Sequence, residues 1–428
     1  MKKIKKDFDM GYFNKLPGEI ALEILIRVPS ETVLDCKLVC KSWRNLLSID
    51  PSFPPKHLYH LNHPSTAAED SCKLGFLALI DNNRLYFFEY NDDQNHELRK
   101  PIERIKRMVT TPIKGSRFIG SCNGLICLVG EEHDIPVRIC NPFTKEYVNL
   151  PEIRIDGDDL DFCTFGFGYL PSTNEYKVVA VHVFETELIE VHIYTLGSGN
   201  GWRNLGKFNS EFSPMYNQDQ EHGSFVNGSI YWAGANLNTI LTFDLIEEKF
   251  CKHLEPPPLP LDTDLQSHTI GVLDGSLYIS ILDEEERGFD VWLLKKKNDK
   301  HEKKGGGEHR SLEWSKEFRA NANHALALTK KGDVLTYCTI DNDLNIYDTK
   351  ASTSKGLVHF EELVCRVFPH NNTFVSLKEL GEKDAEIVSL KEYWEKQMEI
   401  KKAVNRALKE LREKDAEIMK SVNGGRKP

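Results

Sequence analysis

The sequence predicts a mainly β protein with α-helical ends, and two patterns support this class. Short apolar runs, each preceded by a turn, recur through the middle of the chain, and apolar residues at helical spacing fill a segment near each end. The chain has 428 residues, which is enough for one large domain or two to three ordinary ones. The predicted parts are a helical module at 13–53, a connector at 54–71, a β domain at 72–374 and a C-terminal amphipathic helix or coiled coil at 375–423.

The first predicted helix of the module starts at Leu16-Pro17, because proline suits the first turn of a helix. Val28-Pro29 ends it, since the residue before a proline is pushed out of the α region. Between these points, apolar residues recur at the helical positions Ile20, Ile24 and Leu25.

A second helix is predicted to begin near Ser30, whose side chain can cap it, and to end at Asp50-Pro51. Its apolar residues include Val33, Leu34, Leu38, Val39, Trp43, Leu46 and Leu47. So short a segment has more apolar surface than it can bury on itself. It therefore either packs on the rest of the chain or binds a partner.

The order of motifs in this module resembles the F-box. The motifs are Leu16-Pro17, Glu23-Ile24-Leu25, Val28-Pro29 and the run VCKSWR at 39–44. The resemblance covers 13–53 and implies docking to the Skp-type adaptor of a cullin-based ubiquitin ligase. The residues that it implies contact or support the adaptor are Leu16, Pro17, Ile20, Ile24, Leu25, Val39 and Trp43. Trp43 fits a role inside the module's core equally well.

The connector at 54–71 is predicted from its prolines and scattered polar residues. It contains three evenly spaced histidines, His57, His60 and His63. Imidazole suits zinc, copper or nickel, but no cysteine or carboxylate at convincing spacing completes a site. A solvated connector without a metal is the favoured interpretation.

The β domain at 72–374 is predicted from repeated turns before compact apolar runs. Asn-Gly and Asp-Gly turns of this kind are strong hairpin signals. The second turn residue falls at positions 83, 124, 175, 228, 275 and 332, so the interval is 41 to 57 residues. Such a period is typical of propeller blades, and we expect about six, with seven or a distorted ring also possible.

A second element recurs in this domain: an asparagine or aspartate turn and then an outer strand with an aromatic residue, in the runs at 139–151, 241–256 and 345–352. We expect aromatic residues of this kind to fill the space between sheets, and the candidates are Tyr147, Trp202, Phe250 and Trp314. The charged, glycine-containing run at 295–310 is predicted to be a flexible insert.

Several runs in this domain resemble the F-box-associated, kelch- or propeller-like domain of plant F-box proteins, including the S-locus and defence-regulating relatives. The runs are GSCNGLICL, ICNPFTKEYVNLP, FGFGYLPSTNEYKVV, GSFVNGSIYWAG and TFDLIEEKF. The resemblance extends from about Gly120 to Leu294 and implies a substrate-recognition domain of a ligase receptor in a plant.

The C-terminal helix at 375–423 is predicted from charged residues interspersed with regular apolar positions. Eight of twelve core positions of one heptad register are apolar, which suits a long amphipathic helix and is marginal for a coiled coil. Self-association or a partner helix is one interpretation, and a solvated helix packed partly on the β domain is the other.

Composition limits the possible functions. The net charge of −10 gives no footprint for nucleic acid, and no apolar run is long enough to cross a membrane. The N-terminal segment lacks the apolar core of a secretory signal, and the ten cysteines lack metal-ligand spacing, so a cytoplasmic or nuclear location is expected.

No nucleophile elbow, Walker loop or zinc-protease helix occurs in the sequence, so no cofactor and no active site of its own are expected. The predicted function is the substrate-recognition subunit of a Skp–cullin–F-box ubiquitin ligase, with an unidentified target protein on the propeller. The alternative is a non-catalytic interaction scaffold that acts outside any ligase.

Overall fold

The computed structural model describes residues 16–50, 52–62, 73–80, 84–92, 102–107, 116–130, 136–155, 160–185, 188–209, 212, 222–235, 237–259, 268–283, 288–296 and 312–387. The chain divides into two units, at 1–386 and 387–428, and the first unit holds the helices and nearly all of the described β-structure. Among the described residues, no helix has the length and apolar character needed to cross a bilayer. The same residues contain no group of histidine, cysteine and acidic side chains placed to hold a metal ion.

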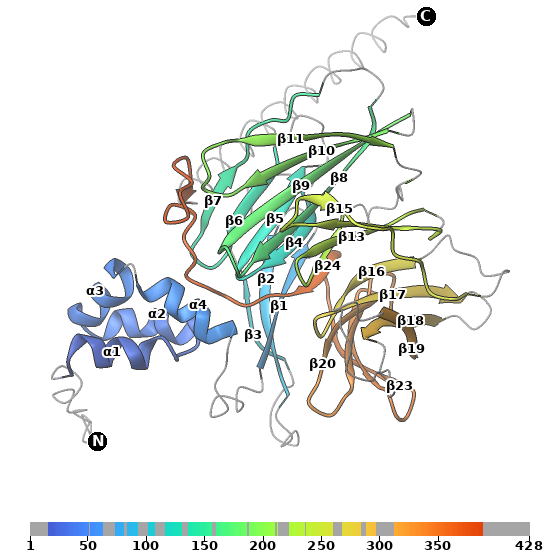
Figure 1. Cartoon of the computed structure of the whole chain (residues 1–428). Helices are drawn as coiled ribbons and strands as arrows, with labels where there is room; N and C mark the ends of the chain where they lie inside the picture. Colours follow the sequence, from blue (N-terminus) through green and yellow to red (C-terminus); the bar gives the residue numbers. More distant parts are fainter. Residues whose placement is uncertain are drawn as a thin grey trace, which may run out of the picture. The chain divides into compact units, whose positions relative to one another are not determined.

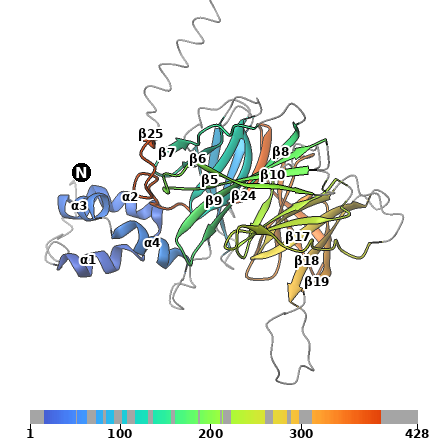
Figure 2. The ribbon, with the colours of Figure 1, turned by 45° about the horizontal axis from the view of Figure 1, so that its top comes forward.

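Four helices form the N-terminal module (Figure 2). They are α1 (Gly18–Leu25), α2 (Ser30–Val39), α3 (Lys41–Ile49) and α4 (Phe53–Asn62). As the sequence predicts, α1 follows Pro17, whose carbonyl accepts the first helical hydrogen bond from the Ala21 N–H at 3.1 Å.

The prediction of one second helix is wrong, because the chain becomes extended at Cys40 and divides it into α2 and α3. The Cys40 thiol sulfur accepts a hydrogen bond from the Trp43 N–H at 3.4 Å and so caps α3. Ser30 is also not the predicted cap: it is the first residue of α2, which follows Pro29 and has no side-chain cap.

The connector prediction is also wrong for 54–62, which lie in α4; residues 63–71 lie outside the described residues. Pro54 and Pro55 occupy the first turn of α4, where the backbone N–H groups have no helical partner and prolines are tolerated.

Six sheets follow the module (Figure 1), and the strands of each lie side by side in order from the innermost to the outermost. Blade 1 contains β24 (Val364–Pro369), β1 (Lys73–Ile80), β2 (Arg84–Asn91) and β3 (Ile102–Arg107). Blade 2 contains β4 (Ser116–Cys122), β5 (Leu125–Gly130), β6 (Arg138–Asn141), β7 (Glu146–Asn149) and β25 (Glu386–Ile387). Blade 3 contains β8 (Leu160–Leu170), β9 (Glu175–Phe184), β10 (Leu188–Thr195) and β11 (Trp202–Asn209).

The remaining blades have four strands each. Blade 4 contains β12 (Ser224–Val226), β13 (Ser229–Ala233), β14 (Ile240–Asp244) and β15 (Lys249–Phe250). Blade 5 contains β16 (His268–Leu273), β17 (Ser276–Asp283), β18 (Gly288–Lys296) and β19 (Leu312–Ala320). Blade 6 contains β20 (His324–Leu328), β21 (Val334–Cys338), β22 (Asp343–Asp348) and β23 (Thr353–His359).

The inner strands close into a ring. Going around, β4 contacts β8, β8 contacts β12, β12 contacts β16, β16 contacts β20, β20 contacts β24, and β24 contacts β4. The domain is therefore a six-bladed β-propeller, which confirms the predicted fold of the β domain. Blade 1 combines both ends of the domain, because β24 from its C-terminal end pairs antiparallel with β1 from its start.

The repeated turns lie at equivalent places in the blades. Those at 124, 175, 228, 275 and 332 join the first and second strands of blades 2 to 6. Asn123 and Gly124, for example, have φ of 47° and 81°, the left-handed backbone that a tight hairpin requires. Residues 81–83, where the first of these turns is predicted, lie outside the described residues.

The second recurring element joins the third and fourth strands of blades 2, 4 and 6. In blade 4, Asp244 Oδ1 accepts hydrogen bonds from the N–H groups of Ile246 at 2.8 Å and Glu247 at 2.9 Å. Equivalent bonds are made by Asn141 and by Asp348. The residue four positions later has positive φ in all three turns. The asparagine or aspartate thus fixes the turn by hydrogen bonding its own backbone.

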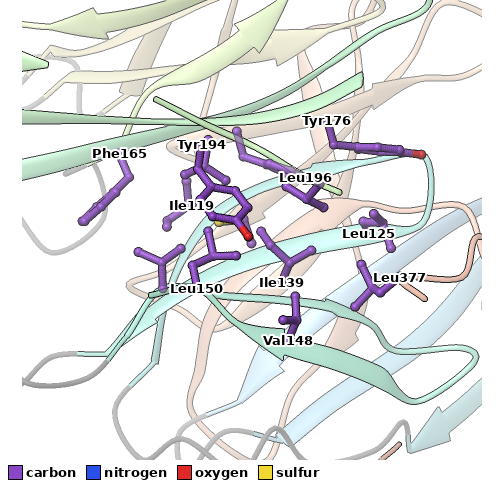
Figure 3. Close-up of a cluster of buried hydrophobic side chains, with 14 of the residues drawn as sticks. Ile119, Leu125, Ile139, Val148, Leu150, Phe165, Tyr176, Tyr194, Leu196 and Leu377 are labelled. Atoms are coloured by element: carbon purple, nitrogen blue, oxygen red, sulfur yellow. The ribbon is translucent and has the colours of Figure 1, made fainter. Parts of the chain in front are cut away.

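The apolar core of the propeller consists of clusters between neighbouring blades. Figure 3 shows the cluster between blades 2 and 3, where Ile139 and Val148 of one sheet approach Tyr176 and Tyr194 of the next. The predicted aromatic residues pack against four such clusters: Tyr147, Trp202, Phe250 and Trp314. This confirms their predicted place between sheets.

The predicted C-terminal helix is wrong for residues 375–387, which form turns and the short strand β25. Val375, Leu377 and Ala385 are buried in the cluster between blades 2 and 3, so this segment packs on the propeller. The Glu382 carboxylate accepts hydrogen bonds from the Tyr194 hydroxyl at 3.2 Å and the Gly197 N–H at 2.7 Å. Residues 388–423 of the predicted helix, and 297–310 of the predicted insert, lie outside the described residues.

Candidate functional site

Two of the predicted adaptor-binding residues belong to the core of the helical module: Leu25 is buried in it, and Trp43 packs against it. Leu25 is 1% exposed and lies in a cluster with Leu22, Ile26, Val33, Leu47 and Phe53. Trp43 is half-buried and packs against the same cluster, so it supports the helices from within. The sequence could not separate Leu25 from the surface residues of its helix, because α1 is apolar on both faces.

The outer surface of the module exposes four other predicted residues. Ile20 is 49% exposed, Ile24 is 42% exposed, and both lie on one face of α1 because they are four residues apart. Val39, in the last turn of α2, is 40% exposed. Pro17 is exposed and Leu16 half-buried at the start of α1. Exposed isoleucines grouped on one helix face mark a surface that favours an apolar partner.

Charged groups border this face. Glu23 and Arg27 form an exposed ion pair, with Arg27 Nη1 and Glu23 Oε2 3.0 Å apart, next to Ile24 along α1. Exposed pairs of this kind contribute little to stability. An apolar centre with a polar edge is the usual composition of a protein interface.

A seam between the module and the propeller is centred on Phe374, which sequence reasoning missed. The Phe374 ring lies 5.5 Å from Phe53, 5.5 Å from His57 and 5.1 Å from Phe143 of the propeller, measured between ring centroids. The Lys37 ammonium lies 4.8 Å from the Phe374 centroid, and partial burial lowers the pKa of Lys37.

Hydrogen bonds reinforce this seam. The Ser30 hydroxyl donates to the Asn372 carbonyl oxygen of the propeller. Within the module, His57 Nε2 lies 2.9 Å from the Val28 carbonyl oxygen and ties α4 to the end of α1. His57 is therefore a buried structural residue. Leu58 of α4 joins the cluster between blades 2 and 3, so the module is fixed to the propeller by several contacts.

The comparisons with known proteins agree with this organisation. The model of an F-box-like family matches residues 13–53, and the model of the F-box associated beta propeller domain matches residues 75–390. The second match continues past 374, in agreement with β25 being part of blade 2.

Curated relatives from Arabidopsis thaliana are similar over most of the chain. A putative F-box protein is 25% identical over 58% of this chain and 62% of its own length. An F-box protein is 26% identical over 69% of this chain and 73% of its own, and an F-box/kelch-repeat protein is 28% identical over 66% and 76%. The chain thus spans less than two thirds of the length of the first of these relatives.

Among solved structures, a chain of the nidogen/laminin complex aligns with a TM-score of 0.39 and 12% identity, over 70% of this chain and 99% of that chain. Alignments this loose carry no functional information. The family matches, by contrast, cover the helical module and most of the propeller. The chain belongs to the family of proteins with an F-box associated beta propeller domain, which in this chain follows an F-box-like helical module.

Proposed function

We propose that this chain is the substrate-recognition subunit of a Skp–cullin–F-box ubiquitin ligase. The helical module docks on the Skp-type adaptor, and the propeller holds a target protein. An F-box followed by a propeller is the organisation of a substrate adaptor, and the family matches support this role. The observation that carries the proposal is the exposed pair Ile20 and Ile24, which an adaptor groove would bury.

In this mechanism the chain contributes no reacting group. It raises the local concentration of a target lysine near the ubiquitin-loaded enzyme that the cullin holds. A defined distance and orientation between adaptor and target favour this transfer. The seam around Phe374 supports such a fixed geometry, since it joins the module to the propeller through buried rings.

The seven predicted residues have different roles in this proposal. Ile20, Ile24 and Val39, with Leu16 and Pro17, form the contact surface. Leu25 and Trp43 hold the helices that present this surface.

The test is the affinity of a purified Skp-type adaptor for the full chain, measured by biolayer interferometry. Replacing Ile20 and Ile24 together by Asp should weaken binding by about 30-fold or more, because burying central apolar residues dominates interface energy. Ile246→Asp is the matched control, because Ile246 is a 60% exposed isoleucine on the propeller.

Leu25→Ala distinguishes residues that would contact the adaptor from residues that support the fold of the module. It should lower the free energy of unfolding of the module by about 2–5 kcal/mol, because it leaves a cavity in the core. Its effect on adaptor affinity should follow the loss of folded module. An unchanged affinity of the Ile20/Ile24 double variant, with its circular dichroism intact, would reject the docking surface.

The interaction scaffold remains the alternative to a ligase receptor. Recovery of a cullin together with the adaptor, from a native extract with the wild-type chain as bait, supports the ligase. Recovery of neither protein by a folded chain favours the scaffold.

A further inference from the structure

A cavity of about 430 Å³ lies among the inner strands of the propeller. Apolar rings line part of it, including Phe118, Phe167, Phe225 and Phe368. Polar side chains line another part: Arg366, His222, His324 and Tyr278. Nothing in the proposed role of the helical module uses this cavity.

His222 is held in place by the neighbouring blade. The Gly223 N–H donates to the Phe165 carbonyl oxygen at 2.7 Å, and the Phe165 N–H donates to His222 Nδ1 at 3.4 Å. Gly223 is required at this position, because a Cβ there would lie 2.5 Å from the Trp232 ring. The backbone of β8 thus sets both the position and the orientation of the imidazole.

This arrangement fixes the tautomer of His222. Because Nδ1 accepts a hydrogen bond, the neutral ring carries its hydrogen on Nε2. Burial, with help from Arg117 and Arg366, lowers the pKa of His222 to about 3, so the ring is neutral near pH 7. Nε2–H is thus a buried donor, and no acceptor for it occurs among the described residues. A buried donor without a partner is costly and calls for an acceptor.

Two other polar groups that line the cavity, Tyr278 and His324, are also neutral near pH 7. Burial raises the pKa of Tyr278 to about 12, so its hydroxyl keeps its hydrogen; its oxygen accepts a bond from the Ala325 N–H at 3.2 Å. Burial and Arg366 lower the pKa of His324 to about 3, and its Nε2 has no hydrogen-bond partner in the described part of the chain. The acid that lines the cavity, Asp274, is exposed in the turn between β16 and β17.

We propose that the central cavity binds a small organic anion, with a phosphate or carboxylate head beside Arg366 and His222 and an apolar body against the phenylalanines. The head would accept the hydrogen bond from His222 Nε2–H and face the guanidinium of Arg366. The volume lies within the range of pockets for small ligands. This proposal goes beyond the ligase role and does not depend on it.

The experiment is isothermal titration calorimetry of the full chain with three probes at equal ionic strength: phenyl phosphate, benzoate and inorganic phosphate. Phenyl phosphate or benzoate should bind with one site per chain. Whichever binds should do so about tenfold or more tightly than inorganic phosphate, because its ring buries apolar surface in the cavity. Phenol, which lacks the anionic head, should bind at least tenfold more weakly than the better anion.

The variant His222→Gln should weaken binding of the better probe by about tenfold or more, because it removes the oriented Nε2–H. His182→Gln is the matched control and should bind with unchanged affinity. His182 is also a buried histidine with an unpartnered ring nitrogen among the described residues, but it lies in β9 outside the cavity.

Absence of binding by all the anionic probes overturns the proposal, and so does an equal loss in the two histidine variants. If His222→Gln fails to fold, crystals of the wild-type chain grown with selenate supply a second readout. An anomalous selenium peak within hydrogen-bond distance of His222 Nε2 supports the site. Ordered water alone at that position, or selenium found as an adventitious ion only, at the surface, counts against it.

Discussion

The helical module and the propeller differ in what they leave unsatisfied. The module has exposed apolar side chains on its outside, with Ile20 and Ile24 nearly half exposed on α1. The propeller buries polar atoms without partners in its interior, including the Nε2 atoms of His222 and His324, as far as the described residues show. The helical module thus has apolar side chains exposed to water, and the propeller has buried polar atoms without hydrogen-bond partners among the described residues.

The difference teaches what each region is suited to bind. An exposed apolar helix face is covered by another macromolecule, because only a large surface can exclude water from it. A cavity of about 430 Å³ takes a small molecule or water, because nothing larger fits. The following predictions, from the largest expected effect to the smallest, test whether this contrast holds.

Acid should destabilise the propeller strongly. Burial is the main cause that lowers the pKa of His182 to about 4 and the pKa values of His222, His324 and His370 to about 3. In the unfolded chain these rings titrate near 6.5, so below that pH the unfolded state binds more protons than the native state. The contribution of these neutral rings to the free energy of unfolding is fully present above about pH 6.5. It is lost as the pH falls toward the pKa values of the folded protein, by about 1.4 kcal/mol per pH unit for each ring.

Urea unfolding at pH 7, 6 and 5, followed by tryptophan fluorescence, measures this loss. His370→Gln should make the dependence on pH less steep, because it removes one of the four rings. A free energy of unfolding that is flat between pH 7 and 5 would show that the interior histidines are not held neutral.

Phe374→Ala should separate the two regions. The ring is 7% exposed and lies in the module's core cluster, and its loss should cost about 3–5 kcal/mol. We expect calorimetry to show two thermal transitions, with the module melting first and the propeller near its wild-type temperature. A single transition at a uniformly lower temperature would mean that other contacts, such as Leu58, hold the seam.

Asn141→Asp tests the hydrogen bonds that join blade 2 to residues 373–375. Asn141 is fully buried, and its Nδ2 donates to the carbonyl oxygens of Thr373 at 3.1 Å and Val375 at 2.8 Å. A carboxylate would remove this donor and place acceptor oxygens against both carbonyls, so the free energy of unfolding should fall by about 2–4 kcal/mol.

Asp244→Asn is the control for that substitution, because Asp244 makes only the equivalent turn and is partly exposed. It should change the free energy of unfolding by about 0.5 kcal/mol or less. Equal losses in the two variants would mean that the turn, and not the contact with residues 373–375, carries the effect.

The sequence predicted the local parts of the fold well. Turns such as Asn123-Gly124 need backbone angles that few residues adopt, so each left a readable signal at its blade. The turn asparagine and aspartates at 141, 244 and 348 were visible for the same reason. The F-box motifs located the helical module, and the F-box-like family model matches the same residues, 13–53.

Features that depend on distant contacts were not predictable from local patterns. The pairing of β24 with β1 joins segments from opposite ends of the domain and leaves no local mark. Leu25 is buried and its neighbour Ile24 is exposed, but both are apolar and α1 is apolar on both sides, so the sequence pattern does not distinguish them. His222 and His324 come from different blades, so only the closed ring brings them to one cavity.

The closure of blade 1 has a consequence for synthesis of the chain. The inner strand β24 ends at Pro369, so five blades can leave the ribosome while the edge of β1 still has no partner. An unpaired strand edge invites aggregation, and Phe374 follows β24 in the chain, so it is synthesised later still. A chain cut short before residue 364 would therefore expose the edge of β1 and would lack the Phe374 ring that packs between the helical module and the propeller.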